Sequence, residues 1–161
     1  MNPMDSKLVR GNFVGTALFV AAAALATPFK EERWAQVVAI VVSVVLFAIG
    51  IFTSLQAYAR ALDRSRVHEI GVANLYLLTG PTAPATVKRS MSGALAIQVV
   101  VAIVAASFGV SGLADSDLNA LAFTVLVPMF GIGMNGAWAA RYGSFGPRLA
   151  PTTKPSNRRI E

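Results

Sequence analysis

The chain has 161 residues, of which 55% are hydrophobic and 14% are charged, with a formal net charge of +6 and a mean hydropathy of +0.58. Soluble domains carry about 25% charged residues, so this composition excludes an ordinary soluble domain and predicts an all-α membrane protein. Because the chain has no cysteine and a single histidine, His68, it cannot form disulfides, thiolate metal sites or the two-histidine ligation of a membrane b-type haem.

Four long apolar runs predict four transmembrane helices packed as a bundle. A helix needs about 20 predominantly apolar residues to cross roughly 30 Å of hydrocarbon. Pro128 interrupts the fourth run and should kink that helix at the preceding turn, because proline lacks an N–H group. The runs cover about residues 8–27, 34–58, 91–113 and 118–140, and they divide the chain into a transmembrane domain, 1–142, and a basic, proline-containing tail, 143–161, which is too polar to order itself.

The first run also has the pattern of a secretory signal peptide. Lys7 and Arg10 precede an apolar stretch that ends in Ala24-Leu25-Ala26, which is the order of a basic region, a hydrophobic region and a cleavage motif. Since Met1 is present, we expect an uncleaved helix that stays in the membrane.

Basic residues gather on one side of the predicted membrane. The N-terminal segment through Arg10, the loop 59–90 and the segment 141–161 carry twelve Lys and Arg residues, whereas the turns 28–33 and 114–117 carry two basic and four acidic residues. Positive residues stay cytoplasmic, so both termini and the loop should be cytoplasmic in a bacterial plasma membrane. Contact with anionic headgroups explains the net charge without a nucleic-acid partner. The aromatic residues near the span ends predict the same orientation. Trp34 is expected at the outer interface, and the inner interface is expected to hold Tyr58, Trp138 and Tyr142.

The cytoplasmic loop 59–90 has helical signals of its own. The segment Ser54–Arg64 contains neither proline nor glycine, so the second helix should extend past the membrane, with Gly71 as its stop. Pro84 suits the first turn of a helix that leads into the third span. Between them, the apolar segment Val72–Leu78 is either a flap against the headgroups or the bundle, or a docking segment for a partner through Leu75, Leu77 and Leu78.

No set of residues predicts catalysis, a cofactor or a metal site. Ionisable residues inside a membrane mark transport pathways, and none of the four cores has one, which argues against small multidrug exporters. Asp63, His68 and Glu69 lack the spacing of a metal-binding or acid–base pair, and we expect them to lie on a solvated basic helix. The sequence therefore predicts no enzyme activity and no cofactor.

Polar and small residues within the spans indicate where helices approach one another. Side-chain amides fall in the inner third of the spans, at Asn12, Gln56, Gln98 and Asn135. Interhelical amide bonds contribute roughly 0.6 to 2 kcal/mol, and small residues permit close backbone contact. The alternative is that the amides line a groove for a lipid headgroup or a partner helix. The candidate packing or partner positions are Gly11, Gly15, Gly50, Gln98, Gly133 and Asn135.

The chain resembles small four-span accessory subunits of mycobacterial membrane assemblies. Ten arginines against four lysines, together with 27 alanines, are typical of proteins from GC-rich actinobacterial genomes. The resemblance covers general topology, and it implies a partner complex such as the Mce lipid importer or a respiratory supercomplex. We therefore expect a non-catalytic accessory subunit that binds other integral membrane proteins and membrane lipids. The alternative is a lipid-binding or lipid-transporting protein that uses its own intramembrane groove.

Overall fold

The chain folds into a helical bundle, which a computed structural model describes for residues 6–110 and 120–148. Four helical segments are long and apolar enough to cross a membrane, which confirms the all-α prediction with four candidate spans. They are α1 at Lys7–Ala26, α2 at Arg33–Arg64, α4 at Ala85–Val110, and a fourth made of η2 at Ala120–Leu126 and α5 at Pro128–Tyr142. The shorter elements are α3 at Val72–Tyr76 and two strands, β1 at His68–Glu69 and β2 at Gly146–Pro147.

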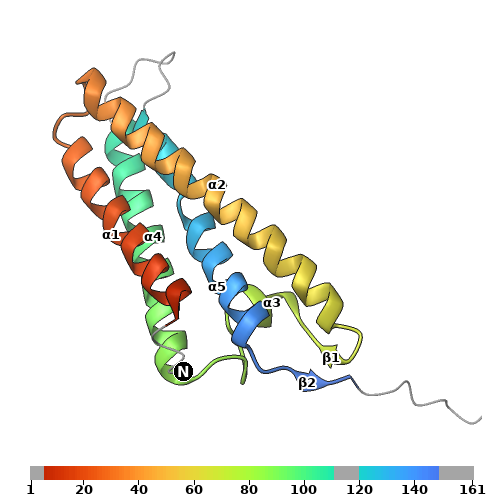
Figure 1. The fold of residues 1–161 in the computed structure, drawn as a ribbon. Helices are drawn as coiled ribbons and strands as arrows, with labels where there is room; N and C mark the ends of the chain where they lie inside the picture. Colours follow the sequence, from red (N-terminus) through yellow and green to blue (C-terminus); the bar gives the residue numbers. More distant parts are fainter. Residues whose placement is uncertain (1–5, 111–119, 149–161) are drawn as a thin grey trace, which may run out of the picture.

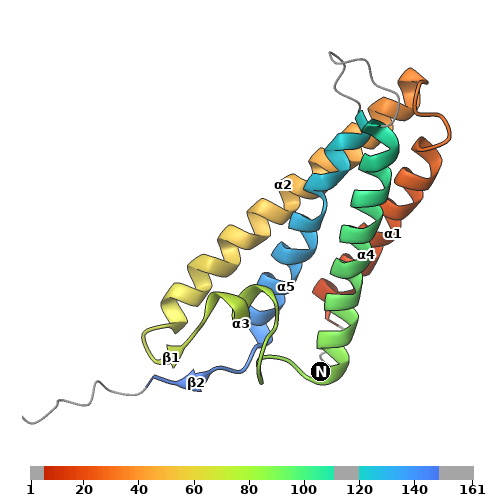
Figure 2. The ribbon, with the colours of Figure 1, turned by 180° about the vertical axis from the view of Figure 1, so that it is seen from behind.

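The four segments run alternately up and down, so the start of α1 and the end of α5 lie at the same end of the bundle (Figures 1 and 2). α2 makes its broadest contact with α5, while α1 lies against α4. We call the end with the start of α1 the basic end. Nine of its described residues are Lys or Arg, namely Lys7, Arg10, Arg60, Arg64, Arg66, Lys88, Arg89, Arg141 and Arg148.

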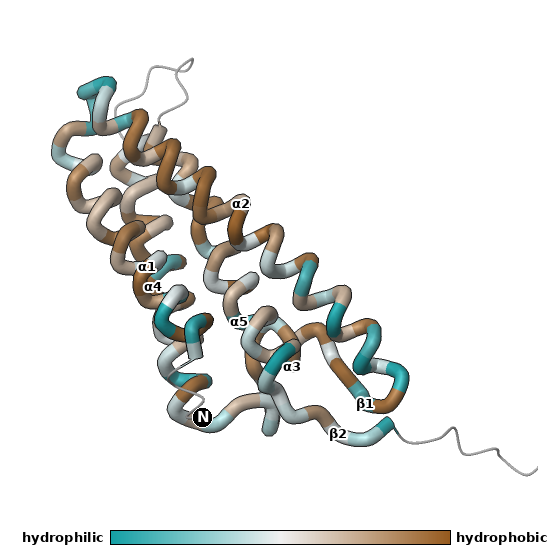
Figure 3. Tube along the Cα trace, in the orientation of Figure 1, coloured by the Kyte–Doolittle hydropathy of each residue, from teal (hydrophilic) through white to brown (hydrophobic). Residues whose placement is uncertain are grey.

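α2 is longer than a membrane span requires. Its 32 residues, at about 1.5 Å per residue, give a length of about 48 Å against about 30 Å of hydrocarbon. Figure 3 shows that the helix is apolar through its middle and mixes polar and apolar residues toward the basic end. The predicted extension is confirmed, but the helix stops at Arg64 and not at Gly71. The chain leaves the helix after Ser65 because His68 and Glu69 pair with β2.

Two prolines set helix boundaries as expected. α4 begins at Ala85, directly after Pro84, whose carbonyl accepts a hydrogen bond from the Lys88 N–H at 3.0 Å. In the fourth span, η2 is a 3-10 helix, and a separate α-helix starts at Pro128 because the proline ring cannot follow an uninterrupted turn. The predicted interruption is therefore confirmed. The predicted turn 114–117 and the adjacent span ends at 113 and 118 lie outside the described residues.

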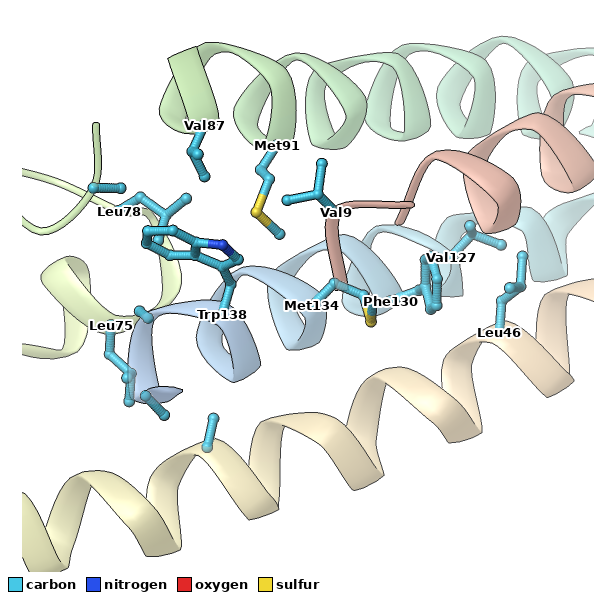
Figure 4. Packing of buried hydrophobic residues seen from close by; sticks show 14 of the residues in the cluster. Val9, Leu46, Leu75, Leu78, Val87, Met91, Val127, Phe130, Met134 and Trp138 are labelled. Atoms are coloured by element: carbon cyan, nitrogen blue, oxygen red, sulfur yellow. The ribbon is translucent and has the colours of Figure 1, made fainter. Parts of the chain in front are cut away.

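The largest buried side chain is that of Trp138, which extends from α5 toward α4 and the loop that contains α3 (Figure 4). It is only 1% exposed and packs among Val87, Met91 and Leu78 (Figure 4). This corrects the expectation that Trp138 marks the inner interface. The physical reason is that the loop folds over the end of α5 and removes the indole from lipid and water.

The apolar segment Val72–Leu78 folds against the bundle. Leu75 and Leu78 are buried in the same cluster as Trp138, whereas Leu77 is half exposed. Leu78 has a φ of 54°, in the left-handed region that non-glycine residues seldom adopt, and its burial offsets the strain of that conformation. The flap alternative therefore describes Leu75 and Leu78, which are covered by their own chain and cannot be docking side chains.

Candidate functional site

A close approach between α2 and α5 occurs at two of the predicted packing positions. A Cβ atom on Gly50 would lie 2.6 Å from backbone atoms of Met129 and Phe130. A Cβ atom on Gly133 would overlap the carbonyl group of Gly50. Backbone atoms cannot move aside as a side chain can, so this contact requires glycine. Gly50 and Gly133 thus meet each other inside the chain.

Gly11 and Gly15 lie where α1 packs against α5. Gly15 faces the ring of Phe130 so closely that a Cβ atom would overlap it, and a Cβ atom on Gly11 would lie 3.3 Å from Cε of Met134. In both cases the neighbour is the end of a side chain, which can shift. This contact is therefore less restrictive than the one between Gly50 and Gly133, but it is also internal to the bundle.

Gln98 ties three helices together from the middle of α4, where its side chain is fully buried. Its Nε2 donates to Oγ1 of Thr16 at 2.7 Å and to Oδ1 of Asn12 at 3.3 Å, both on α1. Its Oε1 accepts from the N–H of Gly131 at 3.0 Å. The first N–H groups of a helix lack intrahelical acceptors, so Gln98 caps the helix that restarts at Pro128.

Asn135 makes a separate contact nearer the basic end. Its Nδ2 donates to the carbonyl of Tyr76 at 3.2 Å, and the Tyr76 hydroxyl donates to the carbonyl of Ser54 on α2 at 3.0 Å. Burial, and to a smaller extent the neighbouring Tyr58, raise the pKa of Tyr76, which keeps its hydroxyl a donor. Asn12, Gln98 and Asn135 are all buried, so they do not form the wall of an open groove.

Arg64 holds the start of the tail, a role that sequence reasoning missed. Its Nη1 donates to the carbonyl of Ala140 and its Nη2 to the carbonyl of Gly143, each at 3.0 Å. The guanidinium also lies 5.1 Å from the ring centroid of Phe145. The last carbonyls of a helix lack partners and carry partial negative charge, so they attract a cation. The tail was expected not to order itself, and α2 supplies the side chain that places residues 143–145.

A polar pocket lies where β1 and β2 pair, beside the end of α2. The strands are antiparallel, with His68 opposite Pro147 and Glu69 opposite Gly146. His68 and Glu69 were expected on a solvated helix, but they lie in a strand, because pairing with β2 replaces the helix. The pocket has a volume of about 480 Å³ and is lined by Ser65, His68, Glu69, Ile70 and Arg148.

Apolar surface is exposed at two other places. A groove of about 450 Å³ runs between α1 and α4, away from the basic end, and its lining includes Ala24, Thr27, Val100 and Val104. A smaller hollow of about 70 Å³ lies between the end of α2 and the segment that begins at Gly71. Three exposed apolar residues border this hollow, and we call them the α2-end patch: Tyr58, Leu62 and Val72.

The buried polar residues of the described chain are all Ser, Thr, Asn or Gln, which carry no charge. Within residues 6–110 and 120–148, no three His, Asp or Glu side chains gather as they would around a metal ion. Comparisons with protein families, curated proteins and solved structures found no match to this chain. The functional inference therefore rests on the geometry of the exposed surfaces.

Proposed function

We propose that the chain is a non-catalytic accessory subunit of a larger envelope membrane complex, such as a lipid importer, and that it acts through contact with other integral membrane proteins. The α2-end patch is the observation that supports this proposal most. Tyr58 is 51% exposed, Leu62 52% and Val72 71%. Contiguous exposed apolar side chains are typical of an interaction surface.

The charge pattern supports an orientation for this contact. The basic end carries the Lys and Arg residues that flank the spans, and such residues remain in the cytoplasm. We therefore place both termini and the α2-end patch on the cytoplasmic side of a bacterial plasma membrane. A partner that covers the patch would then be a cytoplasmic segment of a membrane protein or a subunit bound to one.

Site-specific photo-crosslinking in native membranes tests the proposal. A crosslinking side chain in place of Leu62 or Val72 should capture one protein reproducibly, because both positions face the proposed partner. Glu31, an exposed residue at the opposite end, is the matched control and should give no such product. Equal labelling from all three positions, or no protein product from Leu62 and Val72, would contradict the accessory role.

The groove between α1 and α4 favours a second candidate, a lipid-binding protein. Its lining is almost entirely apolar, and its volume of about 450 Å³ lies within the range of small-molecule sites, which is about 300 to 1,000 Å³. An acyl chain is the occupant that this chemistry fits. Filling the groove by Ala24→Trp should then remove a lipid that the purified chain retains, as measured by mass spectrometry. An unchanged lipid content would contradict this candidate.

A further inference from the structure

The polar pocket at the end of α2 brings together opposite charges that do not neutralise each other. Glu69 and Arg148 both line it, and no ion pair joins them in the described part of the chain. Both side chains are exposed, where an ion pair contributes little to stability, so neither is held away from a ligand by the other. One acidic and one basic side chain are therefore open to a ligand in this pocket. The proposed accessory role, which needs only contact between proteins, does not require such a site.

The backbone holds Arg148 at the pocket. Its N–H donates to the carbonyl of Val67 at 3.1 Å, which extends the pairing of β1 with β2 by one residue. Its Nη1 donates to the carbonyl of Ser65 at 3.0 Å. A guanidinium has five N–H donors in a planar fork that suits phosphate oxygens, so the bond to Ser65 orients the group without using all of its donors.

His68 supplies a second polar group to the same pocket. Its Nδ1 is buried and has no hydrogen-bond partner among the described residues. This leaves Nε2 as the ring nitrogen available to a ligand. A buried N–H without an acceptor is costlier than an unused acceptor, so the neutral ring favours a proton on Nε2, where it can be donated.

The pocket lies beyond the apolar part of α2, at the basic end of the bundle (Figure 3). Ser65 follows Tyr58 by seven residues, which is about 10 Å along a helix. The headgroup layer is about 5 to 8 Å thick on each side of the hydrocarbon. With Tyr58 at the predicted inner interface, the pocket lies near the outer boundary of the headgroup layer.

We infer that this pocket binds the zwitterionic headgroup of a phospholipid that carries a primary amine. Arg148 and His68 contact the phosphate, and Glu69 contacts the ammonium group. A purely anionic headgroup fits less well because Glu69 repels it. A quaternary ammonium also fits less well, since it donates no hydrogen bonds and is held by aromatic faces, and none of the five lining residues is aromatic.

Binding of three phospholipids to the full-length chain in detergent micelles tests the inference. Phosphatidylethanolamine should bind about tenfold more tightly than phosphatidylcholine or phosphatidylglycerol, as expected for one charge-assisted hydrogen bond. Glycerophosphoethanolamine, which has the same headgroup without acyl chains, separates a membrane lipid from a free phosphate ester. Inhibition by the soluble compound at concentrations equal to those of the lipid would show that the ligand is not a lipid and would overturn the inference.

Two variants assign the headgroup contacts. Glu69→Gln should remove the preference for phosphatidylethanolamine over phosphatidylglycerol, and Arg148→Gln should weaken binding of all three lipids about tenfold. Arg141→Gln, at an exposed residue of the same end outside the pocket, should change neither. All three variants should keep the parent melting temperature because these side chains are exposed. Equal affinity of the parent for the three lipids, or an equal loss in Arg141→Gln, would overturn the inference while leaving the accessory role intact.

Discussion

Gln98 on α4 accepts the N–H of Gly131 on α5 at 3.0 Å, and this bond joins the third span to the fourth at the place where proline interrupts it. A Cβ atom on Gly131 would overlap the Gln98 side chain, so the glycine also makes room for its partner. The pair shows how the bundle tolerates a broken helix in its interior: a buried amide replaces the acceptor that the preceding turn would have supplied.

Gln98→Leu should lower the stability of the bundle by about 1 to 3 kcal/mol, because it leaves the Gly131 N–H without its acceptor and removes two bonds to α1. The melting temperature of the purified chain in detergent measures the effect. Gln56→Leu is the matched control, since Gln56 is a half-buried amide of α2 that makes no side-chain hydrogen bond within the described residues. Equal melting temperatures for the two variants would contradict the role of Gln98.

Gly50→Ala should destabilise the chain, because the new Cβ atom would meet the backbone of Met129 and Phe130 at 2.6 Å. Gly93→Ala introduces the same methyl group on α4, where no atom of the described chain lies within 4 Å. Alanine is favoured over glycine in a helix by about 1 kcal/mol, so Gly93→Ala should be neutral or stabilising. If both variants melted at the same temperature, α2 and α5 would not be in close contact.

Arg64→Gln should release the first residues of the tail, because the carbonyls of Ala140 and Gly143 would lose their cationic donor. Hydrogen exchange measured by mass spectrometry should become faster in the peptide that contains residues 143–148. Arg66→Gln is the control, since Arg66 is an exposed neighbour that holds none of these carbonyls. Unchanged exchange in Arg64→Gln would show that the strands hold this segment without help.

The orientation can be measured directly because the chain has no cysteine of its own. Glu31→Cys and Thr86→Cys place single thiols at exposed positions on opposite ends of the bundle. A membrane-impermeant maleimide applied to intact cells should label the cysteine at position 31 and leave the one at position 86 unlabelled, as the distribution of Lys and Arg predicts. Labelling at position 86 alone would reverse the orientation.

The helical spans could be predicted from sequence, while most contacts between them could not. Apolar runs and prolines act locally, so the four helical segments, the start at Ala85 and the interruption at Pro128 follow from neighbouring residues. The bond from Gln98 to Gly131 joins residues 33 positions apart, and the bond from Arg64 to Ala140 joins residues 76 apart. Such contacts depend on how each helix is rotated about its axis, which composition and spacing leave open.

Trp138 shows how a sound local rule can give a wrong position. Tryptophan near the end of a span is typical of a membrane interface, and Trp138 has that place in the sequence. The structure buries it because Leu78 and its loop fold over the end of α5. This fold of the loop requires a left-handed φ at Leu78. Leucine ordinarily avoids that conformation, so the sequence contains no signal that would predict it.

The accessory role is tested most directly by purifying the full-length chain from native membranes in mild detergent and quantifying the proteins that accompany it. Other integral membrane proteins should accompany the chain in a fixed ratio. Leu62→Glu together with Val72→Glu should lower that ratio without lowering the melting temperature, since both side chains are exposed. A chain that purifies alone, or with a protein ratio that the double variant leaves unchanged, would contradict the accessory role.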